Sequence, residues 1–324
     1  MVLSSCLRAA LLGLLSLAFL PSAANAAPSL ADAIKEVDAK YLEVPDVEGE
    51  DNAPKIEAGG GEEEETPGPQ EISQGAVKAA LSYSEDKGED GEITRTPVVT
   101  IFADGKEVAK LEEEGTGFAD PPVSVQIAEI DPGNQYPEVV VSFYTGGAHC
   151  CSDTSVVTSS ADGSAWHTVD VGEFDGGPML ATDLNGDGHY IFQTRDNAFL
   201  YTFACYACSE APLEVLTVEN GAAKNVTTDE KFKPAHAAYL KGMISNVPDE
   251  DVNGFLAGYV GEKILLGEGK QAWDPCLATT TRLRIGDLRS ATNPSTRTAS
   301  ARARRSSSPS PMRSNACLTK MAIR

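Results

Sequence analysis

One short loop carries oxygen-bearing side chains at alternate positions, the arrangement that wraps a hard cation such as calcium. The loop reads Asp183-Leu184-Asn185-Gly186-Asp187-Gly188. Its first, third and fifth residues supply carboxylate or amide oxygens, and Gly188 permits the sharp turn that directs them inward. The backbone carbonyl of the next residue would add a ligand at position seven. The sequence therefore predicts a calcium (Ca²⁺) site, whose ligands would be Asp183, Asn185, Asp187 and His189.

The similarity of this loop to an EF-hand ends at its later positions. Position nine is Ile191, and position twelve is Thr194, where an EF-hand has a bidentate glutamate. A strand is expected beside the loop instead of a helix. The loop resembles the calcium-loop strand units of FG-GAP or VCBS-type repeats, which occur in integrin-like propellers and many secreted bacterial proteins. Those repeats place a further acid where this sequence has Ile191, and the resemblance covers about residues 123–220.

Four cysteines form two close pairs that fall at similar places in two successive strand units. They are Cys150, Cys151, Cys205 and Cys208. If the units lie side by side, the sulfur atoms meet, and two disulfides that cross-link the units are the first prediction. A soft-metal site that adds His149 is a second reading, and thiol–disulfide exchange at the Cys-x-x-Cys is a third. The pairing of the cysteines is left open by the sequence.

The sequence is poor in catalytic signatures. Its four histidines have no metal-ligand spacing, and it contains no Gly-x-Ser-x-Gly elbow, phosphate loop or His-Glu-x-x-His motif. The run Tyr144-Thr145-Gly146-Gly147-Ala148-His149-Cys150-Cys151 resembles a GGAHCC motif of secreted bacterial proteins of unassigned function. That resemblance implies a fold and a compartment but no activity.

Residues 90–227 alternate apolar and polar side chains with a period of two, which is typical of β-strands. Residues 96–111 predict a hairpin around Ala103-Asp104-Gly105, and Glu219-Asn220-Gly221 is a further turn. The segment from Ile127 to Asp131 aligns with that from Met179 to Asp183 at an offset of 52 residues. The pattern predicts a mainly β, antiparallel fold of propeller-blade-like repeat units, with the number of blades left open.

The flanking segments have other compositions. Residues 228–274 have helical apolar spacing at 230–244 and 249–266, which predicts a C-terminal helical pair. Residues 27–89 are predicted to be an acidic, largely disordered linker, since 27–70 carry 13 acidic residues against three lysines. Only residues 29–41 in that stretch have the pattern of a short helix.

The two ends predict export and an atypical tail. Residues 1–26 have the three parts of a secretory signal peptide: one charge at Arg8, an apolar run over 9–20 and an Ala-Asn-Ala cleavage pattern ending at Ala26. No later stretch is long and apolar enough for a transmembrane segment. Residues 275–324 hold nine of the 12 arginines and a single acid. They are either a basic low-complexity tail or the product of a frameshift after about Asp274, and we favour the frameshift.

A formal net charge of −22 argues against nucleic acid as a partner and favours solubility and cation attraction. We therefore favour a periplasmic or secreted, non-catalytic protein that binds an envelope or extracellular ligand of unknown identity. The alternative is a periplasmic redox or soft-metal-handling protein that uses the His-Cys-Cys and Cys-x-x-Cys cysteines. A hydrolytic enzyme is a distant third reading, with no nucleophile to name.

Overall fold

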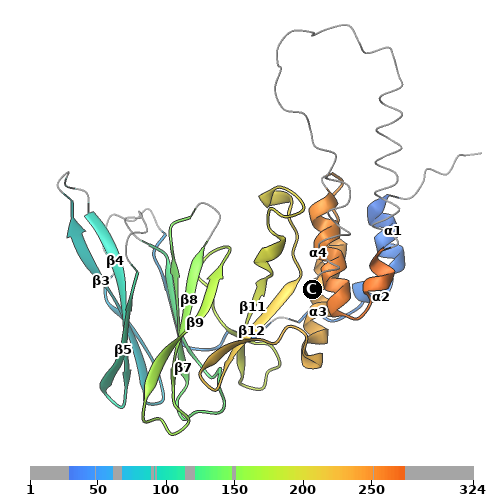
Figure 1. Ribbon diagram of the computed structural model, residues 1–324. Helices are drawn as coiled ribbons and strands as arrows, with labels where there is room; N and C mark the ends of the chain where they lie inside the picture. Colours follow the sequence, from blue (N-terminus) through green and yellow to red (C-terminus); the bar gives the residue numbers. More distant parts are fainter. Residues whose placement is uncertain are drawn as a thin grey trace, which may run out of the picture.

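The computed structural model describes residues 29–47, 49–60, 68–88, 91, 93–113, 121–147, 151–250 and 252–273. Within this part of the chain, three antiparallel sheets and a layer of helices are stacked one behind another (Figure 1). The mainly β, antiparallel fold with a C-terminal helical pair is thus confirmed. The predicted signal peptide (1–26) and residues 275–324, predicted as a basic tail or a frameshift product, lie outside the described residues.

The first sheet is a four-stranded meander in the order β2-β3-β4-β5. Its strands are β2 (Gln70–Gln74), β3 (Val77–Lys87), β4 (Ile93–Ala103) and β5 (Lys106–Glu112). Asp104 and Gly105 have φ values of 49° and 74°, as the two central residues of a type I′ turn require. The hairpin predicted over residues 96–111 is therefore confirmed.

The second sheet lies in the middle of the stack and is covered on both faces. Its order is β1-β6-β7-β8-β9, from β1 (Lys55–Ala58), β6 (Val123–Ala128), β7 (Glu138–Tyr144), β8 (Ser152–Ser159) and β9 (Trp166–Phe174). Val125 and Val141 pack toward the first sheet, whereas Val140 and Val156 pack toward the third. Every residue of β6 is buried, because a strand between two layers has no face left for water.

The third sheet has the order β10-β11-β12-β13 and carries the candidate loop between its first two strands. Its strands are β10 (Thr182–Asp183), β11 (Tyr190–Arg195), β12 (Leu213–Glu219) and β13 (Ala222–Asn225). Asn220 and Gly221 form the predicted turn, with φ values of 52° and 70°. The two aligned segments thus lead into neighbouring open sheets; their resemblance to FG-GAP or VCBS-type repeats stays a prediction.

The helical layer covers the outer face of the third sheet. It contains α1 (Leu30–Val37), α2 (Ala39–Leu42), α3 (Lys233–Ser245) and α4 (Val252–Leu265), with short 3-10 turns at η1 (Asn197–Phe199), η2 (Tyr206–Cys208) and η3 (Glu230–Phe232). Phe232 and Ala235 pack with apolar side chains of β11 and β12. The positions of α3 and α4 confirm the predicted helical pair. None of the described helices has both the length and the apolar character that crossing a membrane requires.

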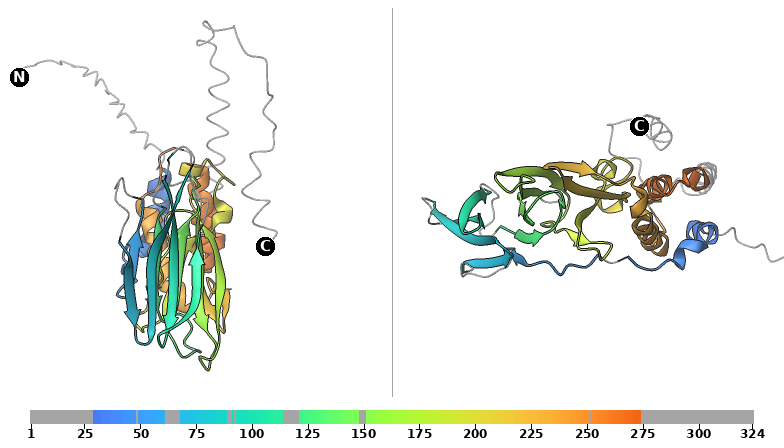
Figure 2. Two further views of the ribbon diagram at one scale, coloured as in Figure 1. Left: turned by 90° about the vertical axis from the view of Figure 1, so that its left-hand side faces the viewer. Right: turned by 90° about the horizontal axis from the view of Figure 1, so that it is seen from below.

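The prediction that residues 27–89 form a largely disordered linker is wrong for the described part of that range. Ser29 caps α1 with a capping box that includes Asp32, and α1 and α2 pack against α3 and α4. The chain after α2 then runs along the stack toward the first sheet (Figure 2). On the way Glu50 pairs with Asp183, and β1 pairs with β6. An acidic composition did not prevent order, because each short apolar stretch joins a distant element.

One buried polar pair ties the helices to the third sheet. The Nδ1 atom of His236 on α3 lies 2.6 Å from Oε1 of Glu262 on α4, and its Nε2 atom lies 2.9 Å from the carbonyl oxygen of Thr227. The other carboxylate oxygen of Glu262 accepts a hydrogen bond of 2.8 Å from the backbone N–H of Leu213, at the start of β12. His236 and Glu262 are 1% and 0% exposed, so both charges depend on each other.

A second buried polar network holds the N-terminal helices against α4. Lys263 donates hydrogen bonds to Asp38 and Glu268, and the Tyr259 hydroxyl donates to Asp38. Lys40 also pairs with Glu268. Partial burial alone would raise the pKa of Glu268, but hydrogen bonds from Lys263 and Lys40 lower that pKa to about 2. Charges at both ends of the described chain therefore neutralise each other inside the helical layer.

Replacing His236 by glutamine should lower the free energy of unfolding by about 3–5 kcal/mol, because Glu262 would keep its buried charge without a cationic partner. Burial alone would lower the pKa of His236, but the hydrogen bond and the charge of Glu262 outweigh it and raise that pKa above its usual 6.5. The stabilisation is therefore complete below pH 6.5 and is lost as the pH rises through the raised value. Urea unfolding between pH 6 and pH 9, both chosen to bracket about 6.5, measures this loss.

The exposed His167 on β9 provides the control for this measurement. The variant His167→Gln should keep the wild-type dependence of stability on pH. An unfolding free energy of His236→Gln that falls with pH as steeply as that of the wild type would contradict the assignment.

Candidate functional site

The loop from Asp183 to His189 is closed by its own backbone amides. Oδ1 of Asp183 accepts hydrogen bonds from the N–H groups of Asn185, Gly186 and Asp187, at 3.2, 2.8 and 3.2 Å. Its Oδ2 accepts one of 2.8 Å from Gly188. Asp183 is 7% exposed, and φ of Gly188 is 86°, so the sharp turn predicted at this glycine is confirmed. The four hydrogen bonds replace the water that a buried carboxylate loses.

Three of the residues predicted as metal ligands line one open depression. These are Asn185, Asp187 and His189, and the other lining residues include Pro132, Glu219 and Lys231. Its volume of ≈ 140 Å³ is well below the roughly 300–1,000 Å³ of pockets that enclose small organic ligands. The depression suits an ion or a single side chain better than an organic substrate.

The fit of a calcium ion to this loop is partial. An ion at Asp183 would compete with four amides for a carboxylate that has about four acceptor positions. Ile191, at the position of the further acid, is 6% exposed and packs with Leu213 and Val215 in the apolar core. Among the described residues, no three His, Cys, Asp or Glu side chains are grouped to hold a metal. Calcium binding here stays a prediction.

The cysteines do not join as a cross-link between the two units. Cys205 and Cys208 form a disulfide with each other, with their Cα atoms 5.0 Å apart. Cys151 is also disulfide-bonded, and its partner is neither of these two. The predicted meeting of the four sulfur atoms across the seam is therefore wrong for the described cysteines. His149 and Cys150 lie outside the described residues.

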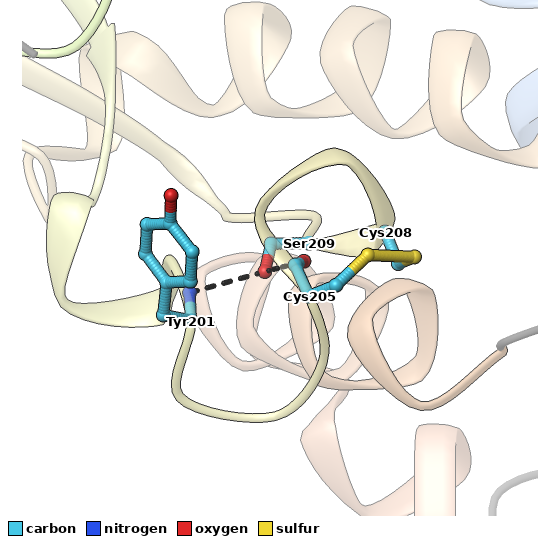
Figure 3. The surroundings of a disulfide bond; sticks show 4 residues. All are labelled: Tyr201, Cys205, Cys208 and Ser209. Atoms are coloured by element: carbon cyan, nitrogen blue, oxygen red, sulfur yellow. Dashed lines mark hydrogen bonds between the residues drawn. A yellow bond between two sulfur atoms is a disulfide. The ribbon is translucent and has the colours of Figure 1, made fainter. Parts of the chain in front are cut away.

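The disulfide closes a small turn within a single loop. The two cysteines are three positions apart. By restricting the unfolded chain, so small a ring stabilises the folded state by about 2 kcal/mol, against about 3 kcal/mol for a 15-residue loop. The backbone N–H of Cys208 donates to the carbonyl oxygen of Cys205 at 3.1 Å. Ser209 Oγ donates to that same carbonyl at 2.8 Å and accepts from the N–H of Tyr201 at 3.2 Å (Figure 3). Hydrogen bonds therefore fix the loop independently of the sulfur atoms.

Four aromatic side chains lie in the segment that contains this disulfide. Tyr201 is 62% exposed and has φ of 56°, a left-handed conformation that is costly for a residue with a side chain. Its ring centroid lies 5.4 Å from that of Tyr206. The Tyr206 hydroxyl lies 2.6 Å from both carboxylate oxygens of Asp175, and this hydrogen bonding raises the pKa of Tyr206. Phe199 and Phe203 form a second ring pair at 5.6 Å, and neither is fully buried.

A row of three glycines on α4, namely Gly254, Gly258 and Gly261, lets the disulfide loop and the residues after it pack closely against that helix. A Cβ atom added to Gly254 would lie 1.9 Å from the carbonyl oxygen of Cys208. One on Gly258 would lie 2.7 Å from the carbonyl carbon of Glu210, and one on Gly261 would lie 3.1 Å from Cγ of Pro212. Glycine in a helix costs about 0.5–1 kcal/mol relative to alanine, so the close approach of the loop explains the row. Its spacing of four and three residues is the sequence signal that could have revealed it.

Comparisons with known proteins place similarity in both halves of the chain. The model of the family described as the sll0997 C-terminal domain matches residues 235–310, from α3 onward. A probable thylakoid lumen protein, sll0997 of Synechocystis, is 39% identical over 211 residues, which are 64% of this chain and 61% of that protein. An uncharacterized protein, y4bJ of Sinorhizobium fredii, is 30% identical over 186 residues, or 56% of this chain and 29% of that protein. No solved structure matches.

These findings bear on the compartment and on the tail. The thylakoid lumen is an extracytoplasmic compartment, and the chain is likewise an exported, extracytoplasmic protein, as the signal sequence predicts. The chain spans less than two thirds of the length of either relative. The family match continues to residue 310, past the position proposed for a frameshift near Asp274. The frameshift stays a hypothesis that resequencing of the gene tests.

Replacing glycine by alanine should have opposite effects on stability in α4 and in α3. Gly254→Ala should lower the free energy of unfolding by about 1–3 kcal/mol, because the new methyl group overlaps the Cys208 carbonyl. A Cβ atom added to Gly242 on α3 would meet no atom within 4 Å. Gly242→Ala should therefore raise the free energy of unfolding by about 0.5–1 kcal/mol. Equilibrium denaturation in urea measures both. A Gly254→Ala protein as stable as Gly242→Ala would show that the loop does not rest on α4.

The calcium prediction has its own test at the Asp183 loop. If the loop binds calcium, the melting temperature should be higher with millimolar calcium than with EDTA, and Asp187→Asn should remove the difference. The control is Asp162→Asn, which should leave the difference unchanged. The Asp162 carboxylate closes a similar exposed turn by accepting hydrogen bonds from Ser160 and Ser164. Equal melting temperatures of the wild type in calcium and EDTA would refute calcium binding.

Proposed function

We propose that this exported chain is a non-catalytic binding protein, and that residues 197–208, the disulfide loop, form its contact surface. The observation that carries the proposal is the conformation and exposure of Tyr201. A large aromatic side chain stands 62% exposed on a residue whose backbone is held at φ of 56°. A strained residue of this kind costs about 1–3 kcal/mol and persists only where the surrounding structure holds it in place.

The rigidity of the loop supports this reading. Hydrogen bonds through Ser209 and the close contact with the glycine row of α4 hold the loop in place. A rigid aromatic side chain loses little conformational entropy on binding, which is why tyrosine is frequent at the centres of protein interfaces. The elements that hold Tyr201 therefore support a surface for contact with another protein.

The charge of the chain adds a preference for the kind of partner. The formal net charge is −22, and Asp175, Asp196 and Glu210 lie beside the loop. A partner with a basic surface would be attracted over long distances, and salt would slow the association. We therefore propose a protein partner whose contact surface is rich in lysine or arginine.

Site-specific photo-crosslinking in the exporting cell tests the contact surface. A photoreactive aromatic residue at position 201 should give one discrete adduct, whose yield falls as the salt concentration of permeabilised cells rises. The same residue at position 93 is the control, because Ile93 is also exposed, at 42%, but lies in the first sheet. An identical adduct pattern at both positions, or no adduct at 201, would contradict the proposal.

A variant at the same residue separates binding from stability. Tyr201→Gly should keep or raise the free energy of unfolding, because glycine adopts positive φ without strain. The partner that co-purifies with the wild-type protein should nevertheless be absent when the Tyr201→Gly variant is purified. A variant that unfolds more easily and still retains the partner would show that Tyr201 is a structural residue.

A further inference from the structure

We propose that the Cys205–Cys208 disulfide is a thiol–disulfide exchange site, and that Cys205 is the sulfur attacked by a protein dithiol. Cys205 is exposed, whereas Cys208 is partly buried. The carbonyl group of Cys208 also lies directly against Gly254 of α4. An incoming thiolate therefore reaches Cys205 with less hindrance, and access is one of the factors that decide which sulfur of a disulfide is attacked.

A role as a structural cross-link explains this disulfide poorly. Both cysteines belong to one turn, three positions apart, so the bond joins no two elements of the fold. Other contacts connect the loop and the segment after it to the rest of the molecule, among them the hydrogen bond from Tyr206 to Asp175, the glycine row and the hydrogen bond from Leu213 to Glu262. These contacts involve no sulfur atom, so they can persist when the disulfide opens.

The hydrogen bonds of the turn favour rapid reclosure. The Cys205 carbonyl accepts from the N–H of Cys208 and from the hydroxyl of Ser209, at 3.1 and 2.8 Å. Both bonds hold the backbone in the shape that the disulfide needs. After reduction the two thiols would therefore remain close together, and the pair can cycle between its two states without refolding of the loop.

The exchange consumes one dithiol and releases one disulfide. A thiolate of the partner attacks Sγ of Cys205, forms a mixed disulfide with it and expels Cys208 as a thiolate. The second thiolate of the partner then attacks the partner's sulfur in the mixed disulfide and expels Cys205 as a thiolate. The partner is oxidised by two electrons to its own disulfide, Cys205 and Cys208 are reduced to two thiols, and the two thiolates take up the two protons that the dithiol gave up.

Trapping the mixed disulfide in the folded wild-type protein tests the proposal without any variant. The exported protein is exposed briefly to reduced glutathione, quenched with an alkylating reagent and cut with trypsin. One peptide, residues 196–224, contains both cysteines. We expect glutathione on Cys205 with alkylated Cys208 at least tenfold more often than the reverse arrangement. Equal labelling of the two, or exchange only in denaturant, would overturn the proposal.

Two matched variants and a protein reductant complete the experiment. Cys208→Ser should form a mixed disulfide with oxidised glutathione at least tenfold faster than Cys205→Ser, and equal rates would contradict the assignment of Cys205. A reduced protein with a Cys-x-x-Cys dithiol should open the wild-type disulfide at least tenfold faster than dithiothreitol at the same concentration. Reduction no faster than by dithiothreitol would show that the disulfide is not a site for protein dithiols. None of these readouts depends on the binding partner of Tyr201.

Discussion

The arrangement of the helical layer depends on one buried carboxylate, that of Glu262. It faces His236 on α3 with one oxygen and the backbone N–H of Leu213 with the other, while it is 0% exposed. Burial of this charge is tolerable only because both oxygens have partners. The consequence is geometric: α4 is fixed relative to α3 and to the first residue of β12. Residues 209–212 connect the disulfide loop to β12, so the same contact also fixes how that loop meets the glycines of α4.

The remaining layers show how a chain with so many acids forms a continuous core. The middle sheet is covered on both faces, and its strands β6 and β7 are buried along almost their whole length, with Gln126 and Glu138 buried among apolar residues. The N-terminal helices belong to the helical layer at one end of the stack, where Asp38 pairs with the buried Lys263. The first and last described helices thus pack together, and the strands of all three sheets lie between them in the sequence. The acidic side chains remain largely on the surface, where they supply the negative field proposed to attract a basic partner.

The sequence predicted correctly those elements whose structure depends on neighbouring residues, namely the strands and the tight turns between them. Alternation of apolar residues and the Asp104-Gly105 and Asn220-Gly221 turns placed the hairpins, because such turns match the twist of the strands. Order before residue 89 was missed, since Ile56 becomes buried only by pairing with Val125, which lies far along the chain. The disulfide prediction assumed that equivalent positions meet. The single glycines of α4 did not predict a close contact, because their role depends on the loop that packs against them.

If Glu262 holds α4 and the disulfide loop as one unit, amide hydrogen exchange in the two elements should respond together to a change at Glu262. In the folded protein, the amides of residues 201, 208, 209 and 213 should be protected, and Glu262→Gln should weaken their protection together with that of α3 and α4. The amides of the first sheet should exchange as in the wild type. Loop amides that exchange at the rate of an unstructured peptide in the wild type, or that remain protected in Glu262→Gln, would contradict the account.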